Sequence, residues 1–334
     1  MNIGFDTIAN ATVLAHDCGE TILVTDPWLQ GSPYFGSWKL SHEVPERMLE
    51  AAKRSKYVWF SHGHPDHLNA DSLPLFRGSK ILLPDHYEGR IAQGLTAQGW
   101  DVTILEDRQW IALSEHIKIF CIADYNQDAI LLIDINGRLL IDLNDAGDRG
   151  WAATVQKMAS RYERSFLLCL SGYGDADMIH YYEEDGCPIL PPAARKFPVG
   201  PRIARKVESI GAKYCIPFSS MHCYQREDSV WANEYVTRLP DYGNQFSSKT
   251  AQILPAYISY DCETDKFESI EPKESNSGIV PAKEFGDDWS DPFSAEDLRL
   301  AESYLRQSSI RRKILGFRQS KSGRKRSFNF TWQA

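Results

Sequence analysis

Three histidines and an aspartate lie close together in one short stretch, and this cluster constrains the chain more than any other feature. The residues are His62, His64, Asp66 and His67. No regular helix or strand places all three imidazoles on one face, so a loop must gather them. The preceding run, Tyr57–Phe60, is short, apolar and β-prone, which indicates a buried strand ending at that loop. Because imidazole and carboxylate groups are common metal ligands in proteins, the stretch predicts a metal site.

The composition is typical of a globular protein in a reducing compartment. Hydrophobic residues make up 43% of the chain and charged residues 25%, which is ordinary for such a protein. No run of ~18 apolar residues predicts a membrane span, and the N-terminus lacks the pattern of a secretory signal. The seven cysteines are scattered and form no Cys-x-x-Cys pair. We therefore expect a cytoplasmic protein without disulfides or a membrane segment.

Short apolar segments alternate with helical ones along most of the chain. Strands are expected at residues 12–15, 21–25, 57–60, 80–83, 102–105, 117–122, 129–133, 139–143, 166–170 and 214–218, and helices at 45–54, 87–98 and from 201. Asn136-Gly137 predicts a type I′ hairpin turn, because both residues tolerate positive φ angles. This alternation favours the α/β class, with mixed sheets of the α+β kind covered by helices.

The motif His-x-His-x-Asp-His at the end of a strand resembles the signature of the metallo-β-lactamase superfamily. That resemblance implies an αββα sandwich with a one- or two-metal centre on one edge of the sheets. It also implies roles for the loop residues of this chain. His62 and His64 would hold the first metal, and Asp66 and His67 would hold the second.

A second stretch makes the resemblance more specific. Asp26-Pro-Trp-Leu-Gln-Gly31, followed by Trp38-Lys-Leu-Ser-His-Glu43, is similar to the metallo-β-lactamase-like domain of the CMP-N-acetylneuraminate hydroxylases. Weaker matches extend the resemblance over roughly residues 20–290, and an aspartate such as Asp26 supports the metal loop in the superfamily. The Cys and His pairs of those enzymes' Rieske domain are absent. Any electrons for an oxidation would therefore come from an external donor.

The resemblance implies further ligands at later strand ends. The next ligand of the first metal is normally a histidine, but residues 122–128 contain none. Asp124 occupies the equivalent place, with Asp128 as the competing choice. The bridging carboxylate is expected at Asp145, and Asp142 is the fallback.

The last histidine and the substrate pocket follow from the same resemblance. His222, after the strand at 214–218, fits the final ligand position of the second metal, and His180 is the other downstream candidate. Aromatic loops should face the metal edge in this layout. The candidate substrate residues are Trp28, Tyr34, Trp38, Tyr173 and His180.

The ligand composition favours oxidation over hydrolysis. The expected set holds four imidazoles and three carboxylates, whereas a zinc hydrolase of the superfamily usually has five and two. The additional charge, from Asp124, stabilises Fe(III) and raises the pKa of a zinc-bound water. We therefore expect two irons per chain and a non-haem diiron oxygenase. It would hydroxylate or N-oxidise a small-molecule or carrier-linked substrate with O2 and a reductase or ferredoxin, with Asp66 and Asp124 as catalytic carboxylates.

Two alternatives stay open. A zinc- or manganese-dependent hydrolase of a phosphodiester, lactone or related bond has the superfamily's commonest chemistry behind it. A binding module that merely retains the ligands is the least favoured, because the ligand set is nearly complete.

The C-terminal part differs from the rest in composition. Residues 1–290 are expected to form the catalytic domain, and residues 291–334 a helix and basic tail that pack on this domain or on a partner. Residues 307–334 carry eight basic side chains and no acidic one, although the whole chain has a net charge of −8. We expect the tail to contact its own acidic domain or a second subunit of a homo-oligomer. The same acidic domain argues against a nucleic-acid partner.

Overall fold

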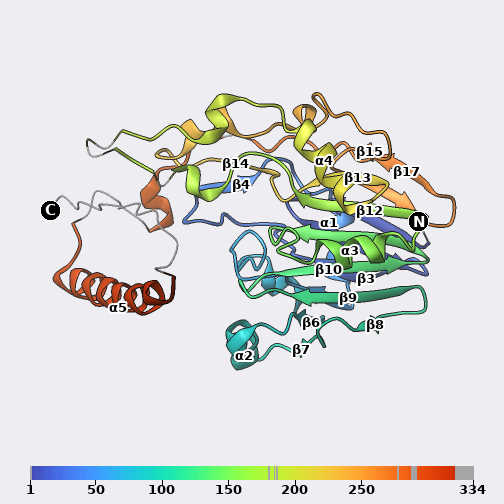
Figure 1. Ribbon diagram of the computed structural model, residues 1–334, viewed down its shortest axis with the longest axis horizontal. Coiled ribbons are helices and arrows are strands. Elements are labelled where there is room, and N and C mark those ends of the chain that lie inside the picture. The colour runs from blue at the N-terminus through green and yellow to red at the C-terminus, as the bar shows by residue number, and fades with distance from the viewer. Residues whose placement is uncertain are drawn as a thin grey trace.

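The fold is built from two large sheets and a short two-stranded ribbon (Figure 1). The computed structural model describes residues 2–179, 181–183, 185, 187–276, 278–286 and 292–319, with side chains up to residue 307 in the last segment. The first sheet has the order β17-β16-β1-β2-β3-β5-β6-β7, and the second the order β15-β13-β12-β11-β10-β9-β8. The ribbon pairs β4 with β14.

The elements have the following bounds. The first sheet contains β1 Gly4–Ile8, β2 Thr12–Asp17, β3 Glu20–Thr25, β5 Tyr57–Trp59, β6 Lys80–Leu83, β7 Val102–Ile104, β16 Ile258–Asp261 and β17 Lys266–Ser269. The second contains β8 Trp110–Ala112, β9 Ile117–Ala123, β10 Ala129–Ile135, β11 Arg138–Asn144, β12 Arg164–Leu170, β13 Tyr214–Phe218 and β15 Gln252–Ile253, and the ribbon contains β4 Trp38–Leu40 and β14 His222–Tyr224. The α-helices are α1 Glu46–Lys53, α2 Arg90–Ala97, α3 Ala152–Ala159, α4 Gly200–Ile210 and α5 Ala295–Gln319. Short 3-10 helices span Leu73–Phe76, Tyr87–Gly89, Ala176–Ile179, Pro192–Arg195, Val230–Tyr235, Leu239–Asp241 and Ala282–Phe285.

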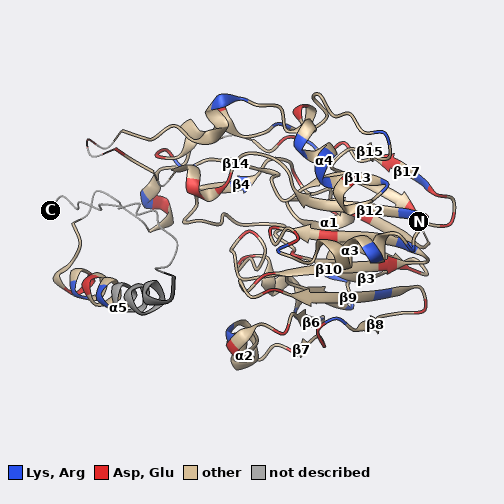
Figure 2. Ribbon diagram, viewed as in Figure 1, with Lys and Arg blue, Asp and Glu red and all other residues tan. Residues whose placement is uncertain are grey.

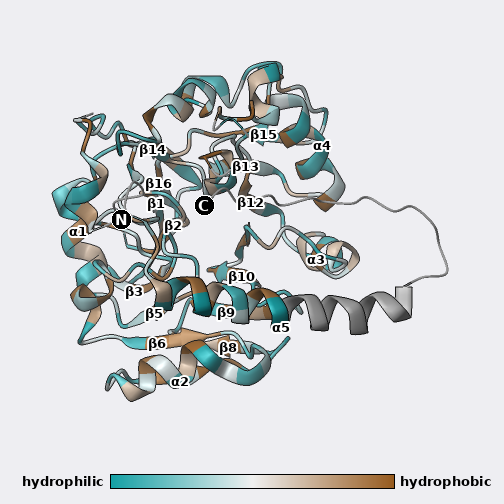
Figure 3. Ribbon diagram, turned by 90° about the vertical axis from the view of Figure 1, so that its left-hand side faces the viewer, coloured by the Kyte–Doolittle hydropathy of each residue, from teal (hydrophilic) through white to brown (hydrophobic). Residues whose placement is uncertain are grey.

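Alternating side chains create the layers of this sandwich. In β10, Leu131 and Ile133 point into the core between the sheets, whereas Ile130 and Leu132 point to the outer face of the second sheet. The outer apolar face of that sheet is covered by α3 and α4, and that of the first sheet by α1 and α2. Figure 3 shows α1 and the α3–α4 pair on opposite sides of the two sheets. The expected αββα sandwich of mixed sheets is therefore confirmed.

The strand directions determine where a site can form. β3, β5 and β6 are parallel, as are β11, β12 and β13, while β9 to β11 form an antiparallel meander. Parallel strands end at the same edge of their sheet, so the segments that follow β3, β5, β11 and β13 can meet there. The predicted hairpin turn is confirmed, because Asn136 and Gly137 have φ angles of 47° and 78°.

The C-terminal helix lies apart from the sandwich (Figure 1). It begins with a capping box, since Ser294 Oγ accepts the N–H of Asp297 and the Asp297 carboxylate accepts that of Ser294. The side chains of residues 295–307 are exposed, and residues 320–334 of the basic tail lie outside the described residues. Figure 2 shows Lys and Arg interspersed with Asp and Glu along the helices and loops. Among the described residues, no helix is both long and apolar enough to span a bilayer.

Candidate metal centre

The candidate centre lies where strands of both sheets end. β5 leads into the histidine loop, β3 ends before Asp26, β11 ends at Asn144 and β13 ends before Ser219. Asp26, Asn144 and Ser219 have φ angles of 38°, 41° and 59°. This left-handed region is uncommon for residues other than glycine, and residues held in it often cluster at functional sites. At these three residues the backbone bends, and the segments that follow β3, β11 and β13 continue along the edge of the sandwich where these strands end.

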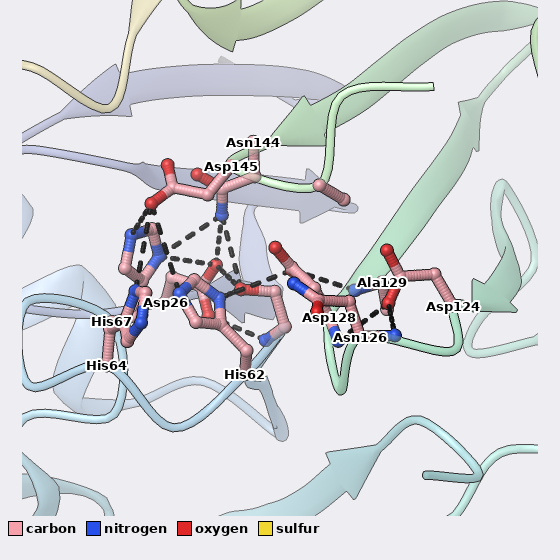
Figure 4. Close-up of polar contacts among 12 residues, drawn as sticks. Asp26, His62, His64, His67, Asp124, Asn126, Asp128, Ala129, Asn144 and Asp145 are labelled. Atoms are coloured by element: carbon pink, nitrogen blue, oxygen red, sulfur yellow. Dashed lines mark hydrogen bonds and ion pairs between the residues drawn. The ribbon is translucent and has the colours of Figure 1, made fainter. Parts of the chain in front are cut away.

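Asp145 faces the imidazoles of the histidine loop (Figure 4). Its Oδ2 lies 3.9 Å from His62 Nε2, 3.9 Å from His64 Nδ1 and 3.6 Å from His67 Nε2. Its other oxygen, Oδ1, accepts a hydrogen bond of 2.6 Å from the Ser219 hydroxyl. One carboxylate oxygen is thus shared by three imidazoles, which is the arrangement expected of a ligand between two metals.

Asp66 forms the other acidic side of the centre. Its Oδ2 lies 3.4 Å from His67 Nε2 and accepts a hydrogen bond of 3.0 Å from the Asn10 amide. Its Oδ1 accepts a hydrogen bond of 2.7 Å from the Tyr34 hydroxyl. Asp66 and His67 therefore lie together, as the motif implies, and Asn10 and Tyr34 hold the carboxylate in place.

Asp26 supports the centre from behind. Its buried carboxylate accepts hydrogen bonds from the Ser61 backbone and hydroxyl at 2.8 and 2.6 Å and from the Asn144 amide, and lies 3.1 Å from His67 Nδ1. A carboxylate on one ring nitrogen orients a histidine so that the other nitrogen can bind metal. The supporting role expected for Asp26 agrees with these contacts.

Unpaired ring nitrogens show that the residues fit a bound cation. His62 Nε2, His67 Nε2 and both ring nitrogens of His222 are buried and make no hydrogen bond within the described residues. Leaving a buried polar atom unpaired costs about 1–3 kcal/mol, so such atoms are rare without a function. Nitrogen and carboxylate donors around one space are the chemistry of a transition-metal site.

The charges at the centre are strongly perturbed. Burial and the neighbouring His67 lower the pKa of His62 to about 2, so His62 is neutral and free to bind metal. Burial opposes protonation of His67 too, but the carboxylates of Asp66, Asp145 and Asp26 raise its pKa well above the usual value. Burial and Asp26 raise the pKa of Asp142, which lies between the sheets. A cation on His67 Nε2 would displace a proton, so metal binding here should release protons.

His222 approaches from the β4–β14 ribbon. It is 2% exposed, and burial lowers its pKa to about 4. The same pKa responds to the charges of Asp66 and Asp145, which face it. Its ring stacks on Trp38 at 3.5 Å between centroids and 11° between planes. The structure thus offers His222 as a neutral, unpaired imidazole on the Asp66 side, whereas His180 lies outside the described residues.

The structure turns Asp124 away from the imidazoles. Asp124 Oδ1 accepts the N–H groups of Asn126 and Asp128, and Oδ2 pairs with Arg149 at 2.9 Å. The carboxylate closes its own turn because the chain folds back there after β9. Asp128 lies instead 3.3 Å from Nδ1 of His62, and Figure 4 shows it between Asp124 and that imidazole. Asp128 therefore supports His62 through its second nitrogen, and the expected ligand role of Asp124 is not what the geometry favours.

The expected substrate aromatics have other contacts. Trp28 is fully buried and donates its indole N–H to the Gly31 carbonyl, and Trp38 and Tyr34 contact His222 and Asp66. Trp38 and Tyr34 therefore pack against residues of the centre, whereas Trp28 packs in the apolar cluster next to them. The substrate contacts expected of these three residues stay a prediction. Tyr173 lies under the Arg202 guanidinium and lines a cavity of about 500 Å³.

Three supporting residues were missed by the sequence reasoning. They are Asn10, Asn144 and Ser219. Each is a small polar residue in or next to a strand end, and such residues are common in turns. Only their contacts across the fold distinguish them, since Asn10 reaches Asp66 and Ser219 reaches Asp145.

Comparisons with known proteins agree with this fold and site. No family model matches the chain. Cytidine monophosphate-N-acetylneuraminic acid hydroxylase of Asterias rubens is 28% identical over 149 residues, covering 40% of this chain and 23% of that protein. The Danio rerio hydroxylase is 23% identical over 152 residues, covering 40% and 25%. The chain thus spans about a quarter of the length of these curated relatives.

Solved structures share the layout at low sequence identity. The diiron β-hydroxylase CmlA from Streptomyces venezuelae has a TM-score of 0.46 and 13% identity, covering 77% of this chain and 54% of that one. A diphosphatase of the PhnP family has a TM-score of 0.41 and 13% identity, covering 79% and 85%. These neighbours include a hydroxylase and a phosphatase, so they do not distinguish between the two reactions.

The class of protein follows from the fold and the site together. The metallo-β-lactamase fold and the distant homology to CMP-N-acetylneuraminate hydroxylases, both expected from the motifs, are confirmed. The chain has this fold, and its His62, His64 and Asp145 form a group whose ligand atoms lie within 4.8 Å of one another, which suits a metal ion.

The contacts of Asp26 predict its effect on the metal. Asp26→Ala leaves His67 without its buried partner, so metal affinity should fall 10- to 100-fold. The free energy of unfolding of the metal-free protein should fall by about 3–5 kcal/mol. Chelator competition and denaturant unfolding measure the two effects. The matched control is Asp6→Ala, which removes a buried carboxylate that pairs with His16 at 3.0 Å and should leave metal affinity unchanged. Metal binding as tight as in the unmodified chain would contradict the role of Asp26.

The two carboxylates of the β9–β10 turn give a second prediction. Asp128→Asn weakens the support of His62 and should lower the affinity for the first metal about 10-fold. Asp124→Asn should destabilise the turn but leave the metal stoichiometry and affinity unchanged. Equilibrium dialysis followed by metal analysis separates the two variants. The opposite pattern would return Asp124 to the ligand set.

Proposed function

We propose that this chain is a non-haem diiron oxygenase. It would hydroxylate or N-oxidise a small-molecule or carrier-linked substrate, using O2 and an external reductase or ferredoxin. We place it in the cytoplasm, in keeping with its seven free cysteines. The observation that carries the proposal is the composition of the His62, His64 and Asp145 group.

Two imidazoles and one carboxylate form this group. Two histidines and a carboxylate with open positions are typical of non-haem Fe(II) oxygenases. The turn that follows β9 carries no histidine, and the carboxylate of Asp128 lies next to His62 instead. Burial raises the pKa of Asp128 to about 7. When this carboxylate is ionised, its negative charge would favour the higher oxidation states of iron over a zinc-bound hydroxide.

The surrounding residues supply binding, orientation and exclusion of water. His62, His64 and Asp145 would hold one metal, and Asp66, His67 and His222 the other, with Asp145 between them. When bound, two irons supply the redox chemistry for O2 activation. Asp26 and Asp128 orient His67 and His62, and the buried aromatic side chains beside His222 keep water away from that side of the centre. The curated relatives are named hydroxylases, which also supports the proposal.

The experiment separates oxygenase from hydrolase. The apoprotein is loaded without oxygen with Fe(II), Mn(II) or Zn(II), and O2 uptake with a reductant is compared with hydrolysis of a model phosphodiester. We expect about two irons per chain and O2 uptake that depends on reductant. Asp145→Asn should lower this uptake roughly 100-fold or more. His16→Gln, which changes a buried histidine that pairs with Asp6, should leave it unchanged.

A zinc or manganese hydrolase would behave differently. Two tightly held zinc ions, pH-dependent phosphodiester hydrolysis and no reductant-dependent O2 uptake would contradict the oxygenase proposal.

A further inference from the structure

His222 is held differently from His62 and His67. His62 Nδ1 lies 2.8 Å from Ser61 Oγ, and His67 Nδ1 lies 3.1 Å from the Asp26 carboxylate. Such partners on the second nitrogen normally fix the orientation of a metal-binding histidine. Neither ring nitrogen of His222 makes a hydrogen bond within the described residues. The Gly174 backbone is its polar neighbour, and packing must supply much of its orientation.

Trp38 supplies the main packing surface for that imidazole. In the β4–β14 ribbon Trp38 pairs with Tyr224, and His222 pairs with Leu40. Trp38 and His222 therefore lie on the same face of the ribbon, and their rings stack at 3.5 Å and 11°. Trp38 is 5% exposed and its Nε1 has no hydrogen-bond partner in the described part of the chain. Packing thus contributes to the position of both rings, with the Gly174 backbone as a polar neighbour of His222 and the Tyr224 side chain as one of Trp38.

Gly174 closes the space around the same ring. A Cβ atom at this position would lie 3.2 Å from Cε1 and Nε2 of His222 and 3.4 Å from Val236. The φ angle of Gly174 is 130°, which side-chain-bearing residues rarely adopt. His222 has little room to move away from the indole.

Tyr34 connects the same aromatic group to a second ligand. Its ring lies 4.4 Å from that of Trp38, and its hydroxyl donates to Asp66. Tyr34 and Trp38, here called the aromatic clamp, thus contact Asp66 and His222, which are two of the three ligands proposed for the second metal. The supports of His62, on the first metal, come from Ser61 and Asp128 instead.

We propose that Trp38 is a positioning residue that controls occupancy of the second metal position independently of the first. The indole holds His222 in the orientation that binds metal, and Tyr34 holds Asp66 beside it. This inference rests on the dinuclear centre of the proposed function, but not on the choice of iron.

The test compares three variants by metal binding. Trp38→Leu keeps an apolar side chain but removes the stacking face, whereas Trp38→Phe keeps an aromatic ring. Trp28→Leu is the matched control, because Trp28 is fully buried in the same apolar cluster as Trp38. Within the described residues, the imidazole of His222 stacks on Trp38 and not on Trp28. Stepwise affinities for Zn(II) and Co(II) are measured by chelator competition, with thermal unfolding of each metal-free variant alongside.

The clamp predicts a selective loss. In Trp38→Leu the second metal should bind at least 10-fold more weakly while the first binds as before, and Trp38→Phe should recover most of the difference. Trp28→Leu should lower the unfolding temperature without changing either affinity. Equal weakening of both metals in Trp38→Leu, or no weakening at all, would overturn the proposal.

A spectroscopic measurement tests the stack itself. With labelled histidine, the chain gives nine imidazole signals, and His222→Gln identifies the one that belongs to His222. In the unmodified metal-free protein this signal should be shifted upfield by the indole ring current, and Trp38→Leu should abolish the shift. An unshifted His222 signal in the unmodified chain would overturn the proposal, even if Trp38→Leu did not fold.

The outcomes also distinguish this inference from the proposed reaction. Two-step binding with a strong preference for zinc and no O2 uptake would contradict the oxygenase and leave the clamp standing. Binding of a single ion by the unmodified chain would overturn the clamp, whichever reaction the enzyme catalyses.

Discussion

The buried carboxylate of Asp26 is the interaction on which the rest of the site depends. Asp26 directly follows β3 of the first sheet. Its carboxylate contacts Ser61 and His67 of the metal loop, and also Asn144 at the end of β11 in the second sheet. One side chain thus joins both halves of the sandwich and sets the positions of the residues next to His62 and Asp145. Because Asp26 is completely buried, these donors have no water to replace it, and losing it would leave them unpaired.

The buried carboxylates around the imidazoles explain why the centre favours cations. The carboxylates of Asp66 and Asp128 are buried and that of Asp145 is mostly buried, and ionised groups are costly away from water. Among the described residues, these three carboxylates contact imidazoles, hydroxyls, amides and backbone groups rather than Lys or Arg side chains. Metal ions can supply the positive charge that these carboxylates lack. The ring nitrogens of His62, His67 and His222 that make no hydrogen bond lie near Asp145. With Asp124 outside the ligand set, the carboxylate of Asp128 next to His62 is the acidic group on which the preference for iron rests.

Local patterns were enough to predict part of this arrangement. The histidine loop could be located from its motif after an apolar run, and the roles of Asp26 and Asp145 were implied by the resemblance to the superfamily. Asp124 also follows a strand, but periodicity cannot say which way a side chain turns in the next loop, and its carboxylate bonds to its own turn. The β4–β14 ribbon was not expected, because each strand has only three residues and gains its stability from a partner far away in the chain. The contact between Asn10 and Asp66 spans 56 positions, and no local signal predicts it.

Anomalous diffraction from crystals loaded with Fe(II) without oxygen can show whether Asp145 lies between two metal ions. We predict two iron peaks about 3.5–4 Å apart. One peak should lie against His62 and His64, the other against Asp66, His67 and His222, and Asp145 should contact both. A single peak, or two peaks neither of which Asp145 contacts, would show that Asp145 does not lie between two metal ions.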